Sequence, residues 1–190
     1  MGSIVCVWML LTGGERPLAA GQESAANEIT WKANFLAKSA TFLDWPGDSP
    51  LHMANTFRWC VFGTFSFGTK LAEMTRDMVI EGKHSEVKWI RKESELTGCQ
   101  IIFVTRSEAK YYAKVLDAAR SARALTVGET ADFLDAGGMV ALFTDGKAPA
   151  FEVNLEAVEA RSGRGSKRNH SFEKRTRLYT GQNRTGGTAS

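Results

Sequence analysis

The sequence is poor in the residues that build metal sites and nucleophilic sites. Its 190 residues include only three cysteines and three histidines, and His52, His84 and His170 are scattered through polar or turn-like contexts. Cys60 and Cys99 lie 39 residues apart. Together with the scattered histidines, these two cysteines match no zinc-ligand spacing. No G-x-S-x-G motif is present. We therefore expect no metal, no cofactor and no catalytic triad.

Long apolar runs are also missing. The longest one, residues 4–11, has eight residues, whereas a membrane-spanning helix needs roughly 20, so we predict no membrane span. It is followed by the small-residue-rich segment PLAAGQ at residues 17–22, which is typical of a signal-peptidase site. We interpret residues 1–21 as a degraded or truncated signal peptide. A disordered or core-packing N-terminus is the alternative.

Cleavage near Ala20 would remove Cys6 and leave two cysteines, Cys60 and Cys99. An even number fits a protein that enters an oxidising compartment. Free cysteine is also a common buried residue, so two separate buried thiols are the alternative to a disulfide.

Composition and charge divide the chain into a body and a tail. With 43% hydrophobic residues, the chain can bury one sizeable core, which we assign to a single domain at residues 27–159. Residues 160–190 form a basic tail, with eight Lys or Arg residues against Glu173, and we expect it to be disordered. The whole chain carries +3, of which the tail supplies 8 − 1 = +7, so the body carries 3 − 7 = −4. An acidic body is not the surface expected of a nucleic-acid-binding domain.

Hydrophobic patterns alternate between strand and helix. Apolar residues recur at helical spacing over residues 27–43, 67–79 and 107–121, and short apolar runs between and after these segments predict strands. This alternation predicts an α/β fold with a mainly parallel sheet covered on both faces. Residues 139–143 and 151–155 are joined by too few residues for a crossover helix. They should form an antiparallel hairpin at one edge.

Gly63 and Gly68 lie in the segment GTFSFGTK at residues 63–70, between a predicted strand and a predicted helix. A phosphate-binding loop there requires Gly-Lys-Ser/Thr, but the order in this chain is Thr-Lys. We predict structural turns at Gly63 and Gly68, and another at Gly137 and Gly138. Carboxylate pairs elsewhere, Glu93/Glu95 and Asp132/Asp135, have spacings typical of helix starts or solvated faces. We therefore predict that the chain is not an enzyme.

An ordered set of short segments runs through two thirds of the chain. It begins with KANFL at residues 32–36 and FLDWP at 42–46, and continues with CVFG, LTGCQIIFV, LTVG and FEVNL, ending at residue 155. This ordered set resembles the YfiR/HmsC-like family of periplasmic proteins. The segment after residue 159 departs from the family, which continues there with an apolar segment.

The resemblance implies a three-layer α/β/α sandwich located in the periplasm of a Gram-negative bacterium, with Cys60 and Cys99 joined as a disulfide. It also implies a non-catalytic regulator that binds the periplasmic domain of an inner-membrane diguanylate cyclase or sensor kinase and represses cyclic-di-GMP signalling. We place the partner contact on the first helix and its Trp-Pro end, at Phe35, Phe42, Trp45 and Pro46. Residues 37–39 depart from the family at this contact.

Two further possibilities stay open. A homodimer is a second candidate assembly. The alternative function is a periplasmic small-molecule binding module, accessory to a receptor or transporter. Its ligand would lie at the carboxyl ends of the parallel strands, around Gly63 and Gly128.

Overall fold

The computed structural model of the protein describes residues 20–43, 45, 54–63, 65–145, 148–161 and 175–179. Its strands are β1 (Thr56–Phe62), β2 (Val79–Ile80), β3 (Lys83–Ile90), β4 (Ile101–Val104), β5 (Leu125–Gly128), β6 (Val140–Asp145), β7 (Ala148–Asn154) and β8 (Arg175–Tyr179). Its α-helices are α1 (Ala20–Phe42), α3 (Phe65–Thr75), α4 (Tyr112–Ala122), α5 (Ala131–Asp135) and α6 (Leu155–Arg161), with short 3-10 helices η1 (Glu93–Leu96) and η2 (Arg106–Tyr111).

The strands form one sheet in the order β2-β3-β1-β4-β5-β6-β7-β8. Five neighbouring strands, β3, β1, β4, β5 and β6, run parallel, while β2, β7 and β8 pair antiparallel. The predicted α/β class, the mainly parallel sheet and the antiparallel β6–β7 hairpin are therefore confirmed. Because β1 and β4 are neighbours and their following helices cover opposite faces, the sheet is doubly wound about this pair.

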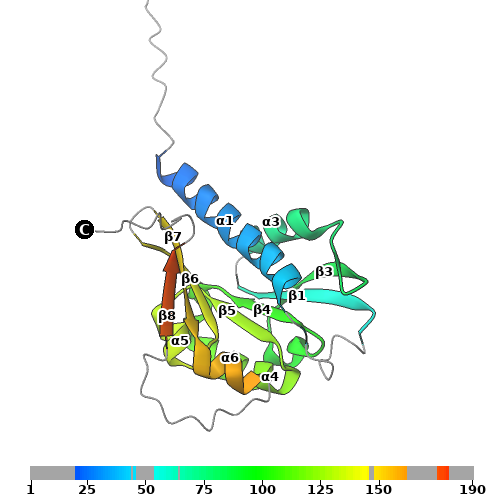
Figure 1. Ribbon diagram of the computed structural model, residues 1–190. Helices are drawn as coiled ribbons and strands as arrows, with labels where there is room; N and C mark the ends of the chain where they lie inside the picture. The colour runs from blue at the N-terminus through cyan, green and yellow to red at the C-terminus, as the bar shows by residue number, and fades with distance from the viewer. Residues whose placement is uncertain are drawn as a thin grey trace, which may run out of the picture.

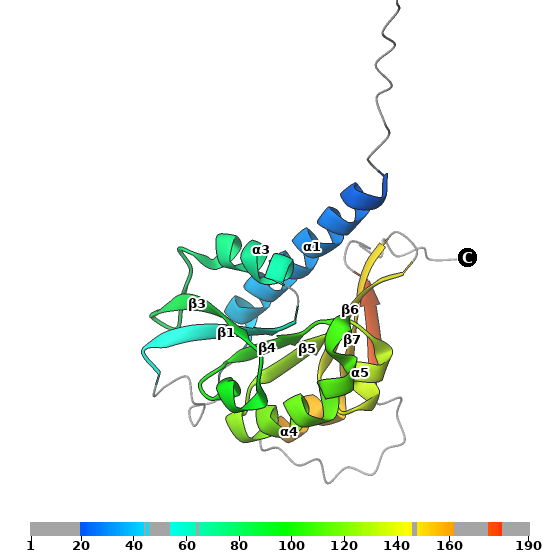
Figure 2. The ribbon, with the colours of Figure 1, turned by 180° about the vertical axis from the view of Figure 1, so that it is seen from behind.

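Helices cover both faces of the sheet, as Figures 1 and 2 show from opposite sides. One face packs against α1, α3 and α6, and its core is rich in aromatic side chains such as Phe57, Trp59 and Phe103. The other face packs against α4 and α5, and its core includes Cys60, Cys99 and Phe133. This is the expected three-layer arrangement. Strands β4 and β5 are buried along their whole length, as strands covered on both faces must be.

Helix α1 packs by a stripe of small and apolar residues. Ala33, Leu36, Ala37 and Ala40 are all buried, at the i, i+3, i+4, i+7 spacing of one helix face. The helix begins at Ala20 rather than at Asn27, because the alanine-rich segment before Asn27 favours helix without needing burial. The expected signal peptide at residues 1–21 lies almost entirely outside the described residues.

Several element boundaries differ from the sequence pattern. β2 was not predicted; it is only two residues long and turns into β3 through Glu81 and Gly82, both at positive φ, as in a two-residue hairpin. Helix α6 was not predicted either. The sequence pattern placed residue 155 at the end of a strand, whereas in the structure it begins this helix. Within the tail expected to be disordered, residues 175–179 form β8 and pair with β7. The edge strand is therefore β8, and the β6–β7 hairpin lies next to it.

Candidate functional site at the amino ends of the strands

The predicted pairing of Cys60 with Cys99 is confirmed, with the two Cα atoms 5.8 Å apart. Cys60 lies in β1 and Cys99 lies two residues ahead of β4, its neighbour in the sheet. Both residues are buried against α4, with exposed fractions of 0% and 1%. A reductant can reach this bond only after local opening, so the geometry is that of a structural cross-link.

The residues that we expected to contact a partner differ in how far they are buried. Phe35 is half-buried and packs against the core, with its ring 4.9 Å from that of Phe151. Trp45 is also buried, whereas Phe42, the last residue of α1, is 84% exposed. Pro46 lies outside the described residues. Of the three expected contact residues that the structure describes, Phe42 is the one with a largely exposed side chain.

Trp45 fixes the end of α1 to the rest of the domain. Its indole Nε1–H donates to the Ala40 carbonyl at 3.2 Å, and its ring packs edge-on against Phe57 in β1. The guanidinium of Arg161, the last residue of α6, lies over the same ring, 5.1 Å from its centroid. Burial lowers the pKa of Arg161 below its ordinary value. The contact therefore joins α1 to α6 through a partly desolvated cation–π pair.

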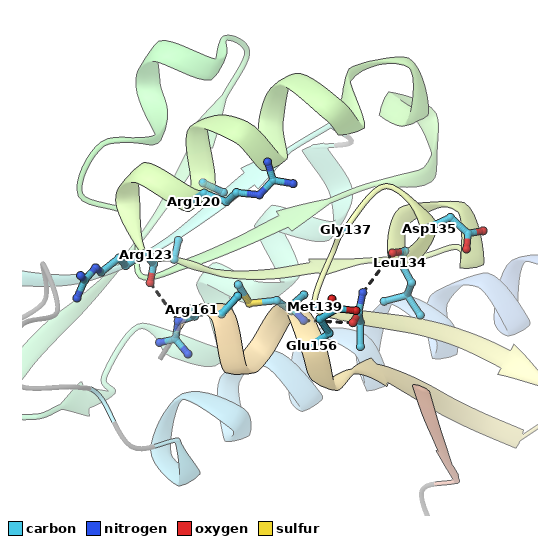
Figure 3. A pocket seen from close by; sticks show the side chains of 13 residues that line it. Arg120, Arg123, Leu134, Asp135, Gly137, Met139, Glu156 and Arg161 are labelled. Atoms are coloured by element: carbon cyan, nitrogen blue, oxygen red, sulfur yellow. Dashed lines mark hydrogen bonds between the residues drawn. The ribbon is translucent and has the colours of Figure 1, made fainter. Parts of the chain in front are cut away.

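Arg161 also borders a cavity of about 600 Å³ at the amino ends of β5 and β6 (Figure 3). The C-terminal end of α4, helix α5, the turn at Gly137 and helix α6 surround it. Sequence reasoning missed this site, because it assigned Arg161 to a disordered tail. The signal was present: Ala157, Val158 and Arg161 share one face of a short helical pattern.

The opposite end of the sheet is closed by a charged cluster. Lys32 of α1 is almost fully buried and pairs with both Glu28 and Glu129, the second at 2.6 Å. Arg106 completes the cluster: its side chain contacts Glu28 at 2.9 Å and its backbone N–H donates to Glu129 at 2.7 Å. Burial raises the pKa of the Glu28 carboxyl, but the hydrogen bond and charge of Lys32, with those of Arg106, outweigh burial and hold that pKa below its ordinary value. Two cations and two anions satisfy one another here.

The predicted glycine turns serve internal packing. Gly63, at φ +129°, lies against the Thr105 side chain, and a Cβ on Gly128 would overlap the Phe133 ring. Gly68 is not a turn; it lies inside α3, where a Cβ would overlap the Trp89 indole. Protein side chains therefore fill the space beside Gly63 and Gly128, where we expected a ligand.

Gly137 and Gly138 lie in the turn before β6. Gly137 has φ +97°, and a Cβ on Gly138 would overlap the Phe133 ring and the Phe133 carbonyl oxygen. The first glycine thus supplies the turn geometry and the second allows a close approach.

The remaining candidate residues form no reactive set in the described part of the chain. Glu95 accepts a hydrogen bond from the Arg91 backbone N–H, and Asp132 lies in the first turn of α5. No group of three His, Cys, Asp or Glu side chains among the described residues is placed to hold a metal ion. None of the described helices is long and apolar enough to cross a membrane.

The fold and the two ends of the sheet define a doubly wound, disulfide-linked α/β domain. The sequence model of the YfiR/HmsC-like family matches residues 30–164, about 70% of the chain. The chain therefore belongs to the YfiR/HmsC-like family, as its sequence segments indicated. No curated protein matches it significantly.

Proposed function

We propose that this protein is a non-catalytic periplasmic regulator that binds the periplasmic domain of an inner-membrane signalling enzyme and keeps it inactive. A diguanylate cyclase is the favoured partner, and a sensor kinase is the second. The observation that carries the proposal is the family match over residues 30–164. A buried disulfide suits export to an oxidising compartment, because such bonds persist there and are rare in the cytosol.

The C-terminal end of α1 supports a docking role. Phe42 is the most exposed of the large hydrophobic residues described, while Trp45, three residues later, is held rigidly by Phe57 and Arg161. Aromatic side chains on a rigid support dominate many protein interfaces, because they bury a large area at little cost in conformational entropy. Phe42 is accordingly the proposed anchor residue.

Deleting the gene and measuring cyclic-di-GMP tests the proposal. We expect the level to rise on deletion and to return to normal when the wild-type chain is restored. Phe42→Ser should fail to restore it although the variant folds. Val79→Ser is the matched control, since Val79 is also an exposed hydrophobic residue but lies on β2 at the sheet edge.

The outcomes separate the parts of the proposal. An unchanged cyclic-di-GMP level on deletion, with no cyclase recovered when the wild-type protein is purified with its partners, would exclude the cyclase. Equal rescue by Phe42→Ser and Val79→Ser would exclude Phe42 as the anchor and leave the regulatory role standing. A fusion of residues 1–21 to alkaline phosphatase tests export separately, since that enzyme is active only where its own disulfides form.

The alternative function, a small-molecule binding module, has one observation in its favour. The cavity at the amino ends of β5 and β6 has a volume typical of ligand sites, which range over roughly 300–1,000 Å³. A ligand there is compatible with the regulatory role, because the two sites use different residues.

A further inference from the structure

The cavity beside α6 has an apolar interior with charged walls. Leu134 and Met139 are buried side chains at its base, and Ala157 lines it from α6. Arg120 and Arg123 come from the α4 side, and Asp135 and Glu156 from the opposite side (Figure 3). An occupant should therefore be mainly apolar and carry few charges.

Backbone groups around the cavity are already hydrogen-bonded within the protein. The Arg123 carbonyl accepts from Arg161 Nε at 3.1 Å. The Asn154 side chain donates to the Leu134 carbonyl and accepts from the Ala157 N–H. These backbone groups are therefore not free to anchor a ligand, and we look for the anchor among the charged side chains.

Arg120 is the side chain best placed to be that anchor. It extends from α4 toward Gly137 on the other side of the cavity, and a Cβ at Gly137 would lie 3.3 Å from its Nη2 (Figure 3). Its Nη1 contacts Asp117 at 2.5 Å, but both side chains are more than half exposed, so this ion pair holds the guanidinium weakly. The guanidinium can thus present its fork of donors to a bound anion.

The charges around the cavity argue against a ligand with more than one negative charge. Arg120, Arg123 and Arg161 line the cavity together with Asp135 and Glu156, and Asp117 pairs with Arg120, so the charges of the site balance at 3 − 3 = 0. Arg161 Nη2 is buried and has no hydrogen-bond partner within the described part of the chain. A dianion such as phosphate would be repelled by the two carboxylates, whereas a single carboxylate needs only the Arg120 guanidinium, which reaches across the cavity toward Gly137.

We propose that this cavity binds a small, mainly apolar molecule with one carboxylate. The carboxylate pairs with the Arg120 guanidinium at the α4 wall, and the apolar part packs against Leu134 and Met139. This site is separate from Phe42 and does not depend on the proposed partner.

Calorimetry and thermal unfolding of the full chain with three matched probes test the proposal. Octanoate, 1-octanol and octylamine share one apolar chain and differ in charge. We expect octanoate to bind about tenfold or more tightly than either of the others, because a charge-assisted bond adds to the same apolar burial. Bound octanoate should also raise the melting temperature by mass action.

Three variants locate the site. Arg120→Met should weaken octanoate binding about tenfold or more and leave 1-octanol unchanged, while Arg76→Met, an exposed arginine beyond the end of α3, should change neither. Ala160→Leu adds bulk from the exposed side of α6 and should weaken both probes. Octanoate binding no tighter than 1-octanol, or unchanged by Arg120→Met or by Ala160→Leu, would overturn the proposal. Each variant's melting temperature without probe confirms that it is folded.

Discussion

The two ends of the parallel sheet are built in opposite ways. At the carboxyl ends of β4 and β5, Lys32, Glu28, Glu129 and Arg106 satisfy one another. At the amino ends, α6 leaves a cavity of about 600 Å³ and α1 ends in an exposed phenylalanine. Ligands of doubly wound proteins usually bind at the carboxyl ends. In this protein that end is filled by an internal network of charges, whereas the amino ends carry the disulfide, the cavity and the exposed Phe42.

The largest effect on stability should come from removing the disulfide near the amino end of β4. It links residues 39 apart, and closing a loop of that length contributes about 4 kcal/mol in the chain-entropy model. We expect the variant Cys60→Ala/Cys99→Ala to lose about this much free energy of unfolding, measured by urea denaturation. Reduced wild-type protein is the control and should match the variant. A loss below about 1 kcal/mol would show that the cross-link is not a major staple.

Opening the carboxyl-end cluster should have the next largest effect. Lys32→Met leaves Glu28 and Glu129 facing each other without their shared cation, and breaking a buried pair in this way costs about 3 kcal/mol. Lys70→Met is the control, because its pair with Glu73 is exposed and should matter by less than about 1 kcal/mol. Equal unfolding free energies for the two variants would contradict the view that the buried charged cluster stabilises the fold.

Removing the cation–π contact at the amino end should cost less. Arg161→Met keeps the length of the side chain but removes the charge over Trp45, and we expect a loss of about 1 kcal/mol. A double-mutant cycle with Trp45→Leu measures the coupling between the two side chains. A coupling energy near zero would mean that α6 and the end of α1 are held by apolar packing alone.

Acid should weaken the carboxyl-end cluster through Glu28. Its pKa is lowered in the folded protein from the ordinary 4.5, so its charge stabilises the fold above pH 4.5 and this contribution is lost as pH falls through the lowered pKa. The stability difference between wild type and Glu28→Gln should therefore be constant from about pH 7 to 5 and shrink below pH 4.5. Urea denaturation at several pH values measures it. A difference that grew on acidification would contradict this linkage.

The smallest effect on stability should come from Phe42, the proposed anchor. Because it is 84% exposed, Phe42→Ser should change the unfolding free energy by less than about 0.5 kcal/mol. Phe35→Ala, on the same helix, should cost more, about 1–2 kcal/mol, since Phe35 is half-buried against Phe151 and packs on the core. Comparable losses would show that Phe42 supports the fold and would weaken its assignment as a contact residue.

Periodicity and composition predicted much of the fold. The helical spacing over residues 27–43 predicted most of α1, whose buried face includes Ala33, Leu36 and Ala40, and short apolar runs such as residues 101–104 predicted strands. The short link before β7 predicted the antiparallel hairpin. These features are local, since each depends on residues within a few positions of one another. The disulfide was identified through the family resemblance, because an even cysteine count also allowed two separate thiols.

The sequence by itself determined the fold class, the alternation of strands and helices and the family. Only the tertiary structure decided where the side chains of Lys32, Arg161 and Phe42 lie and what they contact. Lys32 contacts Glu129, 97 positions away, and Arg161 contacts Trp45, 161 − 45 = 116 positions away, so no local pattern marks either contact. Phe35 and Phe42 are alike in sequence and seven residues apart, yet one is half-buried against β7 and the other is exposed. The physical reason is that burial depends on which elements pack together, and this is settled only when the whole sheet has formed.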